Sequence, residues 1–254
     1  MPGMGDDEDA GRYAAAAGAL LVALRERGAD DGRRLGERGD RAANRCLLEL
    51  FEAEHGGDAV LSEESADDRR RLAADRVWIV DPLDGTREFS EPGRTDWAVH
   101  VALWERGVGV RVGAVALPAQ GRLLSTASPP RLPPPRPGPD RVVVSRTRPP
   151  AVARDVADRL GAELVTMGSA GAKTMAVVLG DVDAYVHDGG QHEWDSAAPT
   201  AVARAAGLHV SRLDGAPLAY NRADSWLPDL LVCRPELADP ILDVTVARRR
   251  GAAG

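Results

Sequence analysis

Hydrophobic and polar positions follow two different rhythms along the chain. In the first part, an uncharged run predicts a helix over 13–24, and apolar residues at helical spacing predict a second helix from about 40 to 53. Short apolar runs separated by Gly, Pro and charged residues then predict an antiparallel sheet, with strands over 59–62, 77–80, 98–103, 110–117 and 122–126. Two helices and one sheet therefore make up the first predicted unit.

A proline-rich segment, SPPRLPPPRPGPD over 128–140, separates this unit from the rest, because it lacks too many N–H donors for a helix or a central strand. Beyond it, strands and helices alternate. Strands are predicted over 141–145, 163–166, 183–187, 208–211 and 229–233, and helices over 150–160, 170–179, 195–206 and from 235. Alternation of this kind predicts an α/β unit. We therefore expect an N-terminal α+β domain over 1–130 and a C-terminal α/β domain over 131–254.

Composition narrows the possible partners. The chain has 254 residues, 44% of them hydrophobic, which is enough for a sizeable core. Its formal charge of −7 argues against a nucleic-acid polymer or an anionic membrane as the main partner. The apolar run over 13–24 is too short to span a bilayer. Cys46 and Cys233 are far apart and match no ligand spacing, so we expect reduced thiols and a cytoplasmic protein.

The segment WIVDPLDGT, over 78–86, ends an apolar strand on two carboxylates. Asp81 and Asp84 are three positions apart, and we expect Pro82 to end the strand pairing, Leu83 to expose its carbonyl, and Asp84-Gly85 to form a turn. Two carboxylates and one backbone oxygen that converge on a point are suited to Mg²⁺. The alternative is a plain turn, for which Asp-Gly is also a signal.

Three further segments supply acids. LSEES contributes Glu63 and Glu64, of which only one can face the same site if both lie in a strand. Asp195 precedes an Ala-rich helix and Asp40 lies at the predicted start of the second helix, where the alternative role of each is an N-cap. Strand ends and helix starts are positions from which residues distant in sequence converge on a cleft, so we expect these acids to form one site.

The motifs WIVDPLDGT, SEE and WDSAA resemble those of the inositol monophosphatase family, whose members are magnesium-dependent and lithium-sensitive, and the likeness runs from about residue 10 to 235. The resemblance implies a layered αβαβα sandwich of the inositol monophosphatase/fructose-1,6-bisphosphatase type. Within the family, the segments GSAGAKTMAV and GGQHEWDSAAP are most similar to the actinobacterial CysQ branch. Those proteins hydrolyse the 3′-phosphate of 3′-phosphoadenosine 5′-phosphate (PAP) to give AMP in sulfate assimilation.

The resemblance also implies a role for each acid. Two or three Mg²⁺ ions are expected, the first region held by Glu63, Asp81, the Leu83 carbonyl and Asp84, and the second by Asp81, Asp84 and Asp195. Asp195 is also expected to contact the substrate. Without metal, so many neighbouring carboxylates repel one another, so we expect raised carboxylate pKa values or disorder there. Inhibition by Li⁺ follows if this ion replaces Mg²⁺ without supplying its charge.

Gly85 and Thr86 are predicted to begin a helical turn whose free N–H groups receive the phosphate oxygens. The resemblance implies that the Thr86 hydroxyl orients the attacking water and that Asp40 helps to deprotonate it, with no phosphoenzyme. The alternative for Thr86 is a plain turn residue.

The second phosphate of PAP requires a cation of its own. Lys173 occupies the position where nucleotide bisphosphate phosphatases have a lysine, although it could instead be a solvated helix residue. Weaker candidates for the same pocket are Ser169, Arg146 and Thr147. Where nucleotide-specific relatives outside this branch have an arginine, this chain has His187, which is less reliably charged near neutral pH. Asp188 either keeps His187 protonated or is an ordinary loop acid.

Other functions remain open from the sequence. The small-molecule substrate could be inositol 1-phosphate or fructose 1,6-bisphosphate, or specificity could be broad, because the metals do most of the chemistry. A catalytically inactive metal- or nucleotide-binding protein is the alternative of another class. Such a protein is expected to lack Asp40, Thr86 or a metal-binding acid, and the chain has all of them. A homodimer is left open as well.

Overall fold

The computed structural model describes residues 5–28 and 32–252. The helices are α1 (Asp6–Glu26), α2 (Gly32–His55), α3 (Thr86–Ser90), α4 (Val152–Leu160), α5 (Ala170–Val178), α6 (Glu193–Ala205) and α7 (Ala238–Ala252). Three short 3₁₀ helices are η1 (Arg69–Ala73), η2 (Pro118–Gln120) and η3 (Pro235–Leu237). No helix in these ranges is long and apolar enough to cross a membrane.

Ten strands form two sheets in the part of the chain that the structure describes. The first sheet has the order β1-β2-β3-β4-β5 and the second the order β7-β6-β8-β10-β9. The strands of the first sheet are β1 (Ala59–Ser62), β2 (Arg76–Asp84), β3 (Ala98–Glu105), β4 (Gly109–Leu117) and β5 (Arg122–Ser125). Those of the second are β6 (Arg141–Ser145), β7 (Glu163–Met167), β8 (Ala184–His192), β9 (His209–Ser211) and β10 (Trp226–Cys233).

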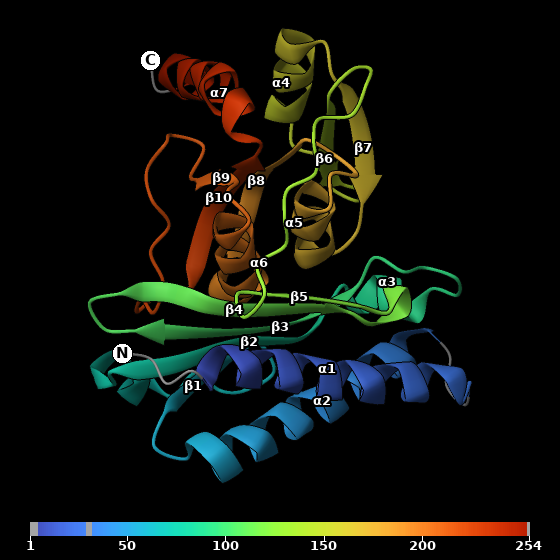
Figure 1. Ribbon diagram of the computed structural model, residues 1–254, viewed down its shortest axis with the longest axis vertical. Coiled ribbons are helices and arrows are strands. Elements are labelled where there is room, and N and C mark those ends of the chain that lie inside the picture. Colours follow the sequence, from blue (N-terminus) through green and yellow to red (C-terminus); the bar gives the residue numbers. More distant parts are fainter. Residues whose placement is uncertain (1–4, 29–31, 253–254) are drawn as a thin grey trace.

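The elements stack in five layers (Figure 1). Helices α1 and α2 cover one face of the first sheet, α5 and α6 lie between the sheets, and α4 and α7 cover the far face of the second sheet. Three clusters of buried apolar side chains join the layers: one between the first sheet and α1 and α2, one around α5 and α6 that reaches both sheets, and one between the second sheet and α4 and α7. Because apolar faces of helices and sheets must be buried against one another, the arrangement is the αβαβα sandwich that the resemblance implied.

Three predictions about the elements need correction. The first sheet is not wholly antiparallel, because β1 runs parallel to β2 and the chain returns between them through η1. Pro82 does not end β2: its missing N–H interrupts the pairing with β3, which resumes where Asp84 pairs with Ala98. Helix α2 begins well before residue 40, so Asp40 lies inside it and is not its N-cap. The proline-rich segment contains neither helix nor named strand, and a domain boundary there stays a prediction.

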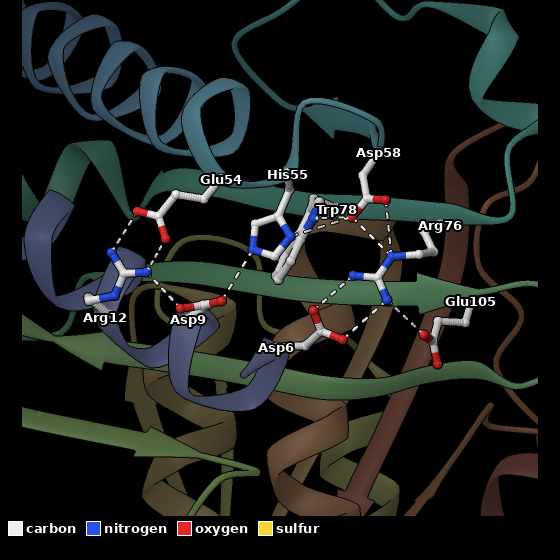
Figure 2. A network of polar contacts seen from close by, with 9 residues as sticks. All are labelled: Asp6, Asp9, Arg12, Glu54, His55, Asp58, Arg76, Trp78 and Glu105. Carbon is white, nitrogen blue, oxygen red and sulfur yellow. Dashed lines mark hydrogen bonds and ion pairs between the residues drawn. The ribbon is translucent and has the colours of Figure 1, made fainter. Parts of the chain in front are cut away.

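A network of polar contacts, which we call the α1–α2 network, joins both N-terminal helices to the first sheet (Figure 2). At its centre the Arg76 guanidinium contacts Asp6 at 2.8 Å, Asp58 at 3.0 Å and Glu105 at 3.0 Å. The other members, as Figure 2 labels them, are Asp9, Arg12, Glu54, His55 and Trp78. The Arg12 guanidinium contacts Glu54 at 2.9 Å and Asp9 at 2.6 Å, so most carboxylates here have a cationic partner.

Candidate active site

Three carboxylates predicted to share a site do come together. Ligand atoms of Asp81, Asp84 and Asp195 all lie within 4.8 Å of one another. Asp81 and Asp84 come from the irregular end of β2, and Asp195 comes from the first turn of α6, which packs on the same sheet. This set of hard oxygen donors could hold a metal ion.

Glu63 and Glu64 both follow the end of β1 in a turn, so the expectation that strand alternation separates them is wrong. The turn nevertheless gives them different neighbours. Glu63 shares a hydrogen bond with Asp81 and feels the charge of Asp195, although part of its side chain meets solvent. Glu64 instead raises the pKa of Asp40. Of the two, Glu63 is therefore the residue that faces the carboxylate cluster, although it is not one of the three acids whose ligand atoms all lie within 4.8 Å of one another.

Asp84 is the most firmly held carboxylate of the cluster. Its oxygens accept hydrogen bonds from the Ser169 hydroxyl at 2.5 Å and from the N–H groups of Ala170 at 3.2 Å and Gly171 at 2.6 Å. The His100 Nε2 atom lies 3.2 Å away. The start of α5 and a buried histidine therefore fix this side chain.

Asp195 is the third residue of α6. The alternative prediction, that Asp195 is the N-cap of this helix, is therefore wrong. His192 is the N-cap, and one Asp195 oxygen accepts the His192 N–H at 2.6 Å in a capping box. The His192 ring also stacks on Trp194 with centroids 4.6 Å apart. The hydrogen bond from His192 thus fixes the orientation of the Asp195 carboxylate, which has a ligand atom within 4.8 Å of those of Asp81 and Asp84.

Charge repulsion in the cluster is visible in the pKa values. Burial, together with the neighbouring carboxylates, raises the pKa of Glu63 to about 7, that of Asp195 to about 6 and that of Asp81 well above its usual range. The prediction of raised values is wrong for Asp84. Burial alone would raise its pKa, but His100 and Lys173 lower it to about 2. A site that holds several acids without enough cations fits a divalent metal ion.

Asp40 and Thr86 meet beside this cluster, as predicted. The Thr86 hydroxyl lies 3.2 Å from an Asp40 oxygen and 3.3 Å from the Leu83 carbonyl, and burial raises the Asp40 pKa to about 7. The close approach of α2 depends on two glycines. A Cβ at Gly36 would lie 2.7 Å from Thr86 Cγ2, and one at Gly39 would lie 2.9 Å from Leu83 Cδ2.

Gly85 precedes α3 with φ of 87°, a left-handed conformation that favours glycine. Thr86 is therefore the first residue of the short helix α3, in agreement with the predicted helical turn. A cavity of about 250 Å³ opens beside this turn. Its lining includes the predicted substrate-binding residues Gly85, Thr86, Arg146, Thr147, Ser169 and Lys173.

Two of the three cationic side chains that line this cavity, Lys173 and Arg146, already have partners. The Lys173 side chain is buried, and its Nζ donates to the carbonyls of Gly168 at 3.2 Å and Ser169 at 2.7 Å, so it is not a solvated helix residue. Burial lowers the pKa of Lys173. The Arg146 guanidinium donates to Glu88 at 2.5 Å and to Glu91 at 2.6 Å. A phosphate entering the cavity therefore competes with partners already present.

His187 has the surroundings of a neutral ring and not those of the cation that an arginine would supply. Burial lowers its pKa, and its Nε2 lies 3.0 Å from the Gly190 carbonyl, which suits a neutral ring that donates this N–H. Asp188 raises the pKa without overcoming burial, so it does not keep His187 protonated. His187 is also not among the residues that line the cavity.

Sequence reasoning missed His100. It lies in β3, fully buried, and its Nδ1 is 3.0 Å from the Trp194 carbonyl while Nε2 faces Asp84. It thus bridges the β2 end and the start of α6. The only signal was one polar residue in the apolar run over 98–103, and such a residue is equally typical of a satisfied core histidine.

Comparisons with known proteins agree with this geometry. The family model described as "Inositol monophosphatase family" matches residues 12–129 and 141–240. The chain is 57% identical over 234 residues to a 3′-phosphoadenosine 5′-phosphate phosphatase from Mycobacterium bovis. The aligned region covers 89% of this chain and 87% of that protein.

Two solved structures have the same fold. Inositol monophosphatase II from Staphylococcus aureus MSSA476 superposes with a TM-score of 0.81 at 20% identity, covering 96% of this chain and 97% of that one. CysQ from Bacteroides thetaiotaomicron superposes with a TM-score of 0.74 at 26% identity, covering 91% and 97% respectively. The chain therefore belongs to the inositol monophosphatase family.

Proposed function

We propose that this protein is a Mg²⁺-dependent phosphatase that hydrolyses the 3′-phosphate of PAP to give AMP and inorganic phosphate. The observation that carries the proposal is the 57% identity to a PAP phosphatase over almost the whole chain. The cavity beside Thr86 supports it, because Lys173 and two arginines, Arg87 and Arg146, line the space next to the carboxylate cluster. A substrate with two phosphates needs cations of this kind in addition to a metal site.

Glu63, Asp81, the Leu83 carbonyl, Asp84 and Asp195 are the groups that would hold the metal ions. When bound, Mg²⁺ neutralises phosphate charge and makes water a better nucleophile near neutral pH. The protein's own contribution is to hold the carboxylates in fixed orientations. Hydrogen bonds from Ser169, Gly171 and His192 to the acid oxygens do so before any metal arrives.

The Thr86 hydroxyl and Asp40 form the proton path. Water attacks phosphorus, the bond from phosphorus to the 3′-oxygen breaks, and a water proton passes by way of Thr86 to Asp40. With a pKa of about 7, Asp40 is suited to accept a proton near neutral pH. The departing 3′-oxygen takes a proton from solvent water, Asp40 later releases its proton to solvent, and no covalent phosphoenzyme forms.

The test is phosphate release by the purified protein with Mg²⁺, comparing kcat/KM for PAP, inositol 1-phosphate and fructose 1,6-bisphosphate. We expect PAP to be preferred by about a hundredfold or more, on the order of 3 kcal/mol in transition-state binding. Similar values for the three substrates would contradict the assignment of PAP while keeping the phosphatase. No turnover of any of them would contradict the enzyme itself and favour a binding protein.

A further inference from the structure

Arg71 is a buried cation for which the proposed reaction has no use. Its side chain is 0% exposed. The guanidinium donates to Asp67 at 2.6 Å and 3.1 Å, to the Asn221 side-chain oxygen at 2.7 Å and to the Arg222 carbonyl at 2.9 Å. Burying a guanidinium is costly unless its donors are satisfied, so this set of partners is specific. The contacts join η1, next to the first sheet, to the loop between β9 and β10, which in Figure 1 reaches from the second sheet toward the first.

Glu193 continues the connection from that loop into α6. It is the first residue of α6 and is 0% exposed. Its two carboxylate oxygens accept the N–H groups of Asn221 at 2.7 Å and Arg222 at 2.8 Å, and its own N–H donates to the Ser225 carbonyl at 2.9 Å. Asn221 has φ of 57°, a left-handed conformation that these contacts hold in place. The loop is therefore tied to the helical turn that contains Asp195.

At its other end the connection reaches the segment of Glu63. Asp67, which binds Arg71 with both oxygens, lies in the same short stretch between β1 and η1 as Glu63. The start of this stretch is fixed by the pairing of β1 with β2. Its end is fixed by Arg71. One continuous set of contacts thus runs from the Glu63 segment through Arg71 and Glu193 to the turn of Asp195.

We propose that Arg71 is a positioning residue that sets the separation of Glu63 from Asp195 and thereby the affinity of the site for divalent metal. The inference rests on the proposed function, because it takes both acids as metal ligands. The two come from segments packed on different elements, and neither β1 nor α6 alone fixes their distance. Arg71 bonds both to the Glu63 segment and to the loop that Glu193 holds. Arg69 also contacts Asp67 and the Ala223 carbonyl, but its side chain is 63% exposed, whereas that of Arg71 is fully buried.

The test compares Arg71→Met with Arg70→Met. Arg70 is a matched control, since its side chain is 91% exposed and pairs with Asp68 on the same turn. Mn²⁺, which takes the same oxygen ligands as Mg²⁺, serves as the calorimetric probe. We expect Arg71→Met to raise the Kd for Mn²⁺ about tenfold, equal to about 1.4 kcal/mol, and Arg70→Met to bind like the wild type.

Two further readouts separate positioning from general damage. At saturating metal, the KM for PAP of Arg71→Met should stay within about twofold of the wild type, because the substrate cavity is untouched. Amide hydrogen exchange at Asn221 and Arg222 should accelerate. Without Arg71 the loop that carries these two residues is held less firmly, so their hydrogen bonds to Glu193 open more often. Unchanged Mn²⁺ affinity in a folded Arg71→Met protein would overturn the inference.

A second variant covers the case in which Arg71→Met does not fold. Asn221→Gly accepts the positive φ and removes the side-chain bonds to Arg71, so its Kd for Mn²⁺ should also rise. Wild-type affinity in Asn221→Gly would then overturn the inference. A wild-type protein that binds no Mn²⁺ would contradict the proposed function as well, whereas normal wild-type binding with unaltered variants would contradict this inference alone.

Discussion

The acidic side chains at the two ends of β2 have opposite electrostatic surroundings. At the Arg76 end, the carboxylates of Asp6, Asp58 and Glu105 surround one guanidinium. At the Asp84 end, the ligand atoms of Asp81 and Asp195 lie within 4.8 Å of each other, and neither residue takes part in an ion pair found among the described residues. The first group needs no further partner, whereas the second does.

The difference shows how a structural and a functional use of charge can be told apart on one sheet. Hydrogen bonds to Asp6 and Asp58 raise the pKa of Arg76, so this pair of charges is mutually satisfied. Burial and like charges raise the pKa of Asp81 and Asp195, so those acids are held at a cost in free energy of folding. Such a cost persists where the group serves a purpose other than stability.

The largest expected effect comes from neutralising one acid of the Asp84 end. Asp84→Asn keeps the size of the side chain but removes its charge, so kcat/KM for PAP should fall by about a thousandfold or more, on the order of 4 kcal/mol. Thermal unfolding should show that the fold is intact. Retention of wild-type turnover would mean that the metal site is assigned to the wrong residues.

A smaller loss is expected at the proton path. Thr86→Ala removes the hydroxyl that contacts Asp40, and kcat should fall by about a hundredfold. Thr86→Ser keeps the hydroxyl and is the matched control, with an expected kcat within about tenfold of the wild type. Equal kcat values for Thr86→Ala and Thr86→Ser in steady-state assays would mean that the hydroxyl has no role in the reaction.

At the Arg76 end of β2, a substitution should change the stability of the protein and leave its activity unchanged. Arg76→Met leaves three carboxylates without their shared cation, so the free energy of unfolding measured in urea should fall by about 2–3 kcal/mol. At a temperature where the variant is folded, kcat/KM should equal that of the wild type. A loss of activity without a loss of stability would break the comparison of the two ends.

The smallest effect is a pH dependence of the metal-free protein. Glu63 and Asp195 have folded-state pKa values of about 7 and about 6, above their ordinary values, so the folded state binds protons that the unfolded state releases. Stability in EDTA should therefore fall as pH rises from about 4 to about 7, lowering the Tm by about 2–4 °C for each kcal/mol. Saturating Mg²⁺ should abolish this slope, and a slope unchanged by Mg²⁺ in thermal scans would count against metal binding at these acids.

Those parts of the site that depend on local chemistry could be predicted from the sequence. Asp81 and Asp84 end an apolar run at a turn, and Asp195 precedes an Ala-rich segment, so their positions follow from strand and helix signals. The layered sandwich followed from the resemblance rather than from periodicity. Periodicity alone predicted two helices and a sheet, then an alternating unit, without saying how the two sheets stack.

The rest depends on contacts between distant segments. Glycines at positions 32, 36 and 39 lower the helix propensity at the start of α2, so the sequence predicts a helix start at Asp40, although this residue lies well inside α2. His100, Arg71 and Glu193 resemble ordinary core or surface residues until the fold brings their partners to them. Local patterns cannot identify such residues, because each partner lies on another element.

The close approach of α2 to the Thr86 turn has a consequence for how mutations are tolerated. Gly36 and Gly39 take no part in the proposed chemistry, yet a methyl group at either would press on Thr86 or Leu83. In a saturation mutagenesis library selected for activity, both positions should therefore be depleted of every other residue about as strongly as the carboxylates themselves. A map of functional constraint drawn from such a library would extend along α2 beyond Asp40, to residues that take no part in the proposed chemistry.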